Sequence, residues 1–152
     1  MSVLVGTNVL LRLAQPASPH HASAQAALIQ LAGQQAELCL VPQIIYEYWS
    51  VATRPVAVNG LGMSTPDVER SIEMLLADFS LRRDERGIFA HWMNLVSTHD
   101  VRGKNSHDAR LVASMIRHGI ADLLTFNDAD FLRFTEIQVW TPARILAGAF
   151  RG

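Results

Sequence analysis

Short apolar runs along the chain alternate with longer segments in which apolar residues recur every three or four positions. Short runs bounded by turn-forming residues are typical of buried strands, whereas the longer periodic segments are typical of helices. The runs predict five strands, at residues 2–5, 37–41, 80–82, 122–126 and 137–140. Because a helical segment separates each strand from the next, the pattern predicts an α/β fold with a mostly parallel sheet.

Proline, glycine and serine mark the ends of several predicted helices. Proline suits the first helical turn because its missing N–H has no partner to lose there, and glycine suits the left-handed residue after a helix. Ser106 suits the position before the first turn of a helix that reaches His118. Residues 55–63 are expected to form a mobile loop near the functional site. Helix starts are predicted at Pro19, Pro42, Pro66 and Pro142, and helix ends at Gly33, Arg54 and Gly119.

Length and composition are those of an ordinary globular domain. The chain has 152 residues, of which 49% are hydrophobic and 18% charged, so it can build a core of its own. We expect a single domain spanning residues 1–152. No apolar stretch reaches the length of a membrane span and no signal segment precedes the first strand, so a cytoplasmic location is expected.

Cysteine content and net charge exclude some functions. Cys39 is the only cysteine, which excludes an internal disulfide and a cysteine-based zinc site. The 13 basic and 14 acidic residues give a net charge of −1, which argues against sequence-independent coating of nucleic acid. A local basic patch is still compatible with this balance.

Acidic and amide side chains stand at the ends of the predicted elements. Glu47 lies in a mostly apolar helix, Asp108 lies in a first helical turn, and Asn127 and Asp130 follow the fourth strand. Taken singly, each has a structural explanation: a salt bridge at a helix edge, an acid that complements the helix dipole, and a turn. Because the carboxyl ends of parallel strands meet at one edge of a sheet, we expect these side chains to share a pocket.

This set of residues has the chemistry of a magnesium or manganese site. Oxygen donors without histidine or cysteine suit Mg²⁺ or Mn²⁺, and such ions polarise a phosphate and activate a water. We expect Glu47, Asp108 and Asp130 to hold the metal, with Thr7 and Asn127 orienting water or ligands. Phosphodiester hydrolysis is the reaction that this site predicts.

Four further residues are candidates for contact with a substrate. Arg12 follows the first strand, and Arg102 and Lys104 flank the turn before His107. The basic side chains suit phosphate oxygens, and His107 is next to the predicted metal ligand Asp108. The alternatives are a solvated charged loop for the basic residues and simple packing at the helix start for His107.

Other classes of protein fit the sequence less well or remain open. The histidines do not have the spacing of a zinc site, and the chain has no phosphate-binding Gly-x-x-x-x-Gly-Lys-Ser/Thr loop. A phosphatase with an aspartate nucleophile needs that residue directly after the first strand, where Gly6 and Asn8 stand. A scaffold that binds RNA or a protein partner without cutting it remains the alternative.

Four motifs occur in the order and spacing of a known family. Residues 3–11 read Val-Leu-Val-Gly-Thr-Asn-Val-Leu-Leu, residues 107–109 read His-Asp-Ala, and residues 124–131 carry Leu-Thr-x-Asn followed by Asp-Phe. With the helical Glu47, these motifs resemble the PIN-domain ribonucleases, and among them the VapC-type toxins of bacterial toxin–antitoxin pairs. The similarity covers nearly the whole chain and departs at Gly6, where the family has aspartate.

The resemblance implies a three-layer α/β/α fold with about five strands and endonucleolytic cleavage of RNA, often transfer RNA, with Mg²⁺ or Mn²⁺. It also implies a homodimer and a cognate VapB-like antitoxin, which would fill the site with its tail and supply the DNA binding. Because Gly6 and Asn127 replace acidic ligands, we expect metal affinity and water activation to be impaired. Either Gly6 is a change that relieves toxicity or the chain is a natural member retained for binding, and the intact Glu47, Asp108 and Asp130 favour the first explanation.

Overall fold

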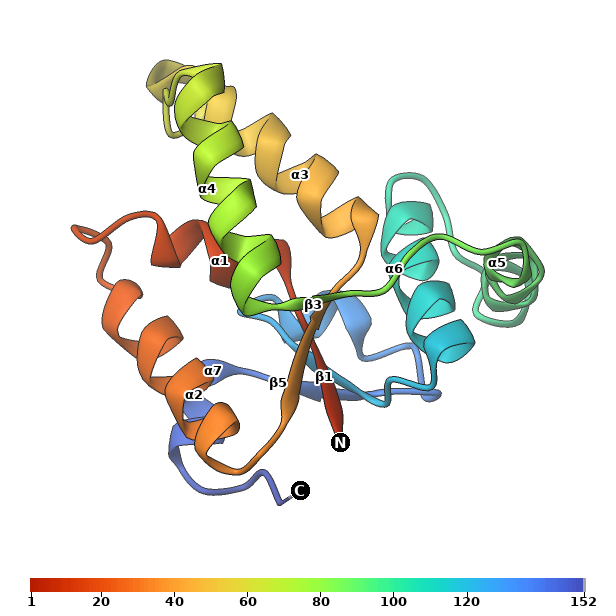
Figure 1. The fold of residues 1–152 in the computed structure, drawn as a ribbon. Helices are drawn as coiled ribbons and strands as arrows, with labels where there is room; N and C mark the ends of the chain where they lie inside the picture. Colours follow the sequence, from red (N-terminus) through yellow and green to blue (C-terminus); the bar gives the residue numbers. More distant parts are fainter. Residues whose placement is uncertain (152) are drawn as a thin grey trace.

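A five-stranded sheet forms the centre of the molecule, as seen in a computed structural model that describes residues 1–151 (Figure 1). Every neighbouring pair of strands is parallel, and the strand order is β3-β2-β1-β4-β5. The five predicted strands are confirmed, with ends that move by at most two residues. They are β1 (Ser2–Val5), β2 (Glu37–Leu40), β3 (Ser80–Leu81), β4 (Asp122–Leu124) and β5 (Gln138–Trp140).

Helices flank the sheet, with α2 and α6 on opposite sides of it in Figure 1. The predicted α/β fold is therefore confirmed. The inner residues of β1 and β4 have no exposed surface, which explains why these strands read as continuous apolar runs. The helices are α1 (Thr7–Leu13), α2 (His21–Gly33), α3 (Pro42–Thr53), α4 (Thr65–Asp78), α5 (Gly87–Thr98), α6 (Asn105–His118) and α7 (Pro142–Leu146), with short 3₁₀ turns η1 (Val56–Val58) and η2 (Asp128–Phe131).

The length of these helices can be compared with the thickness of a membrane. Within residues 1–151, no helix combines the length and the apolar character that crossing a membrane requires.

The order of the strands fixes where a ligand can bind. The sheet grows from β1 in two directions, because β2 and β3 lie on one side of it and β4 and β5 on the other. Leu4 of β1 accordingly pairs with Cys39 on one side and with Leu123 on the other. In open α/β sheets, ligands bind at the carboxyl ends of the strands where the order reverses in this way. The residues that follow β1 and β4 therefore occupy the expected binding edge.

Three of the predicted helix ends are wrong. Helix α2 begins two residues after Pro19 and continues through Gly33, and the positive φ (62°) falls on Gln35. Helix α6 begins at the residue before Ser106, which therefore lies inside the first turn. Backbone hydrogen bonds close these turns, including one from the Ser106 N–H to the Gly103 carbonyl (3.1 Å), so no side-chain cap is needed. The predicted starts at Pro42, Pro66 and Pro142 and the predicted ends at Arg54 and Gly119 are confirmed.

The segment 55–63, which we expected to be a mobile loop, is tied to the end of α3. Its backbone N–H groups at Leu61, Gly62 and Met63 donate to carbonyl groups of α3 and Arg54 at 2.8–3.1 Å. A Cβ atom on Gly60 would lie 1.9 Å from the Arg54 carbonyl oxygen, so only glycine allows this approach. Three consecutive residues of the loop are therefore hydrogen-bonded to the end of α3.

Candidate functional site

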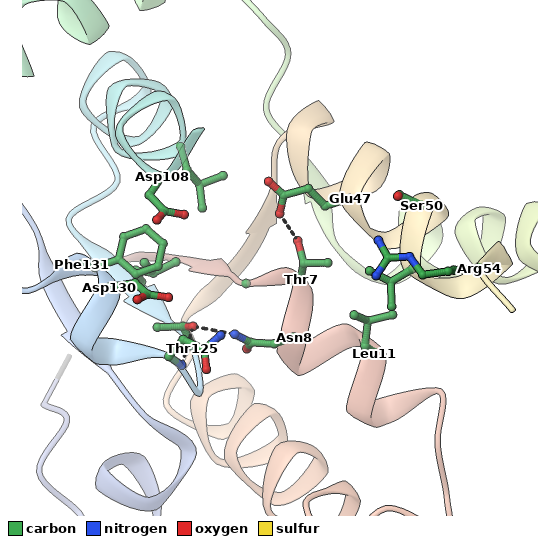
Figure 2. Close-up of a pocket in the computed structure, with 15 residues that line it drawn as sticks. Thr7, Asn8, Leu11, Glu47, Ser50, Arg54, Asp108, Thr125, Asp130 and Phe131 are labelled. Carbon is green, nitrogen blue, oxygen red and sulfur yellow. Dashed lines mark hydrogen bonds between the residues drawn. The ribbon is translucent and has the colours of Figure 1, made fainter. Parts of the chain in front are cut away.

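A pocket of about 340 Å³ opens at the carboxyl edge of the sheet, where the ends of β1 and β4 meet α3 and α6 (Figure 2). Asp108 reaches it from α6 and Asp130 from the turn after β4, whereas Glu47 reaches it from α3 on the other side. The pocket thus collects side chains that are far apart in the sequence. Six predicted site residues line it: Gly6, Thr7, Glu47, Asp108, Asn127 and Asp130.

Two side chains that follow β1 hold neighbouring elements around this pocket. The Thr7 hydroxyl donates to Glu47 Oε2 (2.8 Å), which ties α1 to α3. Asn8 Nδ2 donates to Thr125 Oγ1 (2.9 Å), and Asn8 Oδ1 accepts from the Phe126 N–H (3.0 Å). Because these bonds link α1 to both α3 and the end of β4, Thr7 and Asn8 set the width of the pocket.

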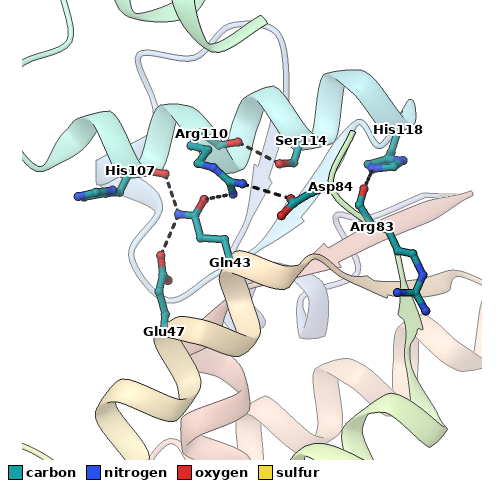
Figure 3. Close-up of polar contacts among 8 residues, drawn as sticks. All are labelled: Gln43, Glu47, Arg83, Asp84, His107, Arg110, Ser114 and His118. Atoms are coloured by element: carbon teal, nitrogen blue, oxygen red, sulfur yellow. Dashed lines mark hydrogen bonds and ion pairs between the residues drawn. The ribbon is translucent and has the colours of Figure 1, made fainter. Parts of the chain in front are cut away.

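Glu47 is held from its other side by the buried side chain of Gln43 (Figure 3). Gln43 Nε2 donates to Glu47 Oε1 (2.9 Å) and to the His107 carbonyl (2.8 Å), and Gln43 Oε1 accepts from Arg110 Nη1 (3.2 Å). Arg110 in turn donates to Asp84 (3.2 Å). Carboxylate and carbonyl oxygens only accept and guanidinium groups only donate, so these partners fix the orientation of the amide. Gln43 therefore clamps α3 against the first turn of α6.

The carboxyl group of Asp108 has a raised pKa in this pocket. Burial, followed by the nearby carboxylates of Asp130 and Glu47, raises the pKa of Asp108 from 3.8 to about 6, against smaller opposing effects of Arg133 and His107. Burial and like charges both disfavour an ionised carboxyl group. At neutral pH the pocket therefore holds more negative charge than its own residues compensate.

Because the ionised Asp108 carboxylate is unfavourable in this pocket, we expect Asp108→Asn to stabilise the fold. A carboxyl group whose pKa is higher in the folded state loses stability as the pH rises from about 3.8 through 6, so the penalty is fully present at pH 7.5 and absent below pH 3.8. After allowance for solvent screening, the variant should gain about 1–2 kcal/mol at pH 7.5, or about 3–6 °C in Tm. Thermal unfolding in EDTA at pH 7.5 and below pH 3.8 measures this, with Asp128→Asn, which lies outside the pocket lining, as the control. An equal gain at both pH values would contradict the explanation.

Gly6 leaves little room for the carboxylate that the resemblance leads one to expect. Its N–H donates to the Leu124 carbonyl (2.8 Å), and a Cβ atom would lie 2.9 Å from that same oxygen. The backbone itself is permissive, because φ −69° and ψ 154° suit any residue. A larger residue at position 6 therefore requires the backbone to shift where β1 meets β4.

The predicted substrate contacts all lie outside the lining of the pocket. Arg102 is exposed and pairs with Asp100 (2.9 Å), and Lys104 is exposed just before α6. His107 is exposed, and its carbonyl accepts from Gln43. None of these three lines the pocket. Arg12 lines two adjoining cavities between α1 and segment 55–63.

Sequence reasoning missed two residues of the site, Gln43 and Arg54. Gln43 binds Glu47, and Figure 2 shows Arg54, directly after α3, with its guanidinium group turned to the pocket that it lines. The signal was the helical spacing, since Gln43 is four residues before Glu47 and Arg54 seven residues after it. These positions share one face of α3, the face that carries the predicted ligand.

The donors in the pocket have the chemistry that Mg²⁺ or Mn²⁺ requires. Glu47, Asp108, Asp130 and Asn127 offer hard oxygen atoms, and neither thiol nor imidazole lines the pocket. The raised pKa of Asp108 is also consistent with a site whose negative charge would be compensated by a bound cation. Within residues 1–151, however, no three His, Cys, Asp or Glu side chains are grouped closely enough to hold a metal ion. The donor set thus fits such an ion in kind and charge, and the carboxylates would have to draw closer to bind it.

Known proteins match this chain by a family model and by structure. The family model described as PIN domain matches residues 3–137. No curated protein gives a significant sequence match. At the identities found, the structural likenesses establish the fold. They include VapBC2 from Rickettsia felis bound to a promoter DNA fragment (14% identity, 93% of this chain and 98% of that chain, TM-score 0.72), VapBC-1 from nontypeable Haemophilus influenzae (17%, 94% and 99%, TM-score 0.70), and the sarcin–ricin loop cleaving toxin VapC20 from Mycobacterium tuberculosis (15%, 84% and 92%, TM-score 0.62).

Proposed function

Since the chain belongs to the PIN domain family, we propose that it is a cytoplasmic, metal-dependent endoribonuclease of the VapC toxin type whose activity is impaired by Gly6. Two features support the proposal. The pocket gathers three carboxylates at the switch point of the sheet, and one similar structure is described as a sarcin–ricin loop cleaving toxin. The proposed substrate is therefore RNA, with transfer RNA among the candidates.

The proposed ion is Mg²⁺ or Mn²⁺, held by Glu47, Asp108 and Asp130. When bound, such an ion supplies an activated water and stabilises the charge that develops on the phosphate. The Thr7 hydroxyl keeps the Glu47 carboxylate oriented along the pocket. Asn127 is exposed at the pocket mouth, where its amide would orient a water or a phosphate oxygen. The chain's own residues thus position the proposed ligands, of which Asp108 is partly buried.

One observation carries this proposal: three carboxylates from three different elements line one pocket, and burial together with the charges of Asp130 and Glu47 raises the pKa of Asp108 to about 6. Perturbed carboxyl groups of this kind concentrate at functional sites. Cleavage of transfer RNA and messenger RNA, measured with Mn²⁺ and with EDTA, tests it. We expect weak cleavage that both EDTA and Asp130→Asn abolish. If neither the chain nor its Gly6→Asp variant cuts RNA with Mn²⁺ present, the proposal is wrong.

The second candidate is a PIN scaffold that binds RNA or a protein partner without cutting. Two observations favour it: Gly6 offers no oxygen ligand, and residues 1–151 contain no ready-made group of three metal ligands. This function predicts RNA binding that Gly6→Asp leaves unchanged and no gain of cleavage. The same pair of proteins therefore distinguishes the two functions.

We also propose a homodimer and a cognate VapB-like antitoxin as partners. Two of the similar structures are VapBC assemblies, and one of those is bound to promoter DNA, so DNA contact would come through the antitoxin. Size-exclusion chromatography with light scattering measures the state of the chain alone. Co-expression with the antitoxin should protect cells from the Gly6→Asp variant.

A further inference from the structure

Two partly buried arginines near the pocket lack an acidic partner. Among residues 1–151, four basic side chains of Lys or Arg are partly buried. Arg82 pairs with Glu37 and Arg110 with Asp84, whereas Arg12 donates only to the neutral Gln15 (3.0 Å) and the Arg54 side chain has no hydrogen bond or ion pair within that range. Withdrawing a guanidinium group from water without an anion is costly, so this pair marks a place where an anion is expected.

The surroundings of Arg12 and Arg54 form a continuous trough that leaves the pocket. A cavity of about 450 Å³ shares Asn8, Leu11 and Val51 with the pocket. It continues into a cavity of about 560 Å³, with which it shares Arg12, Gln15, Gly60 and Leu61. We call these two cavities, together with Arg54 at their junction with the pocket, the arginine trough.

Charge changes sign along this path. The pocket is lined by three carboxylates, whereas neither cavity of the arginine trough is lined by any acidic residue, and their only charged residue is Arg12. The remaining lining combines amides, at Asn8, Gln15 and Asn59, with apolar side chains such as Leu11 and Leu61. Guanidinium groups suit phosphate, amides suit sugar and base edges, and apolar side chains suit base faces.

The trough is also preorganised. One wall is segment 55–63, which backbone hydrogen bonds fix to α3 and which Gly60 allows to lie against Arg54. The other wall is α1, whose first turn is held by the two Asn8 bonds to the residues after β4. A rigid groove needs little ordering when a strand binds, so more of the contact energy remains as affinity.

We propose that the arginine trough is the binding site for the single-stranded RNA backbone next to the cleaved bond, with Arg54 and Arg12 contacting successive phosphates. This inference rests on the proposed ribonuclease function and names the path of its substrate. The strand leaves the pocket between α1 and segment 55–63. It does not pass over the turn before α6, where Arg102 is already paired with Asp100 and Lys104 lies outside the pocket lining.

Fluorescence anisotropy with a labelled single-stranded RNA of about ten nucleotides tests this path, in EDTA so that no cleavage occurs. Arg54→Gln and Arg12→Gln should each weaken binding about three- to tenfold and lower the salt slope by about one. Arg117→Gln, which removes an exposed arginine paired with Glu85 at the far end of α6, is the matched control and should change neither quantity. Because Arg12 lies in the last turn of α1, the Tm of each variant is measured to separate folding from binding.

Four outcomes would overturn the inference. RNA affinity that falls in Arg102→Gln but not in Arg54→Gln or Arg12→Gln places the strand over the turn before α6. If Arg54→Gln and Arg12→Gln weaken binding of a polyglutamate peptide but not binding of RNA, the trough is a site for an acidic protein segment. If the parent chain does not bind RNA and Gly6→Asp does not cleave it, the proposed ribonuclease function is wrong as well. If Gly6→Asp cleaves RNA but Arg54→Gln and Arg12→Gln bind RNA as tightly as the parent chain, only this inference is wrong.

Discussion

Replacing Gly6 by aspartate is expected to raise Mn²⁺-dependent RNA cleavage by about 10²- to 10³-fold, the size of effect that one group stabilising transition-state charge produces. The new carboxylate would stand directly after β1, in the lining of the pocket that holds Glu47, Asp108 and Asp130. It adds a fourth acidic donor where the described residues lack a close group of three. Initial rates of cleavage over a Mn²⁺ titration measure the gain.

The same substitution should lower stability, and a matched variant separates the two effects. A Cβ atom at position 6 would lie 2.9 Å from the Leu124 carbonyl oxygen, so β1 and β4 must shift at a cost of about 1–3 kcal/mol. Gly6→Ala carries the same Cβ without an oxygen ligand. It should therefore lose stability like Gly6→Asp and gain no cleavage. Equal cleavage by both variants would mean that the strand shift, and not the carboxylate, restores activity.

Gln43→Leu is expected to weaken Mn²⁺ binding by about 10- to 100-fold, the usual effect of removing a group that orients a metal ligand. The substitution removes the bonds of Gln43 to Glu47, to the His107 carbonyl and to Arg110 together. Glu47 and the turn that carries Asp108 would then be free to move apart under their mutual repulsion. Titration of Mn²⁺ by electron paramagnetic resonance, on the chain and on Gly6→Asp, measures the affinity.

The control for this prediction is Gln30→Leu. Gln30 also uses its amide to join two helices, because it donates to the Ile145 carbonyl of α7 (2.7 Å), but it does not line the pocket. Both variants should lose stability, since each removes a side-chain hydrogen bond that joins two helices. Of these two variants only Gln43→Leu should lose Mn²⁺ affinity. A third variant, Asp84→Asn, should show a smaller loss than Gln43→Leu because it loosens Arg110 alone. Equal affinities in Gln43→Leu and Gln30→Leu would refute the positioning role of Gln43.

The sequence predicted the elements well because strands buried on both faces must be apolar throughout. Val3, Leu4 and Val5 have no exposed surface, and they had been recognised as a strand for that composition. Helix ends were less predictable, because several side chains can end or begin a helix. At Gly33 and Ser106 the preferred residue was present, yet backbone hydrogen bonds closed the turn elsewhere.

The predicted site residues were found because they stand at the ends of strands and helices, and these ends can be inferred from the sequence. Gln43 and Arg54 were missed because each has an ordinary local role, one in the first turn of α3 and one at its end. Their importance depends on partners 64 and 67 residues away for Gln43 and on a cavity wall for Arg54. Such relations become visible only when the chain is folded.

The amino-acid sequence alone determined the alternation of strands and helices, the family motifs and the acidic residues at the carboxyl edge, because periodicity and residue type are local properties. The tertiary structure decided how closely the carboxylates approach, how tightly β4 closes on Gly6 and which arginines lack an acidic partner. These quantities depend on distances of a few ångströms between elements that packing brings together, and no local pattern encodes them.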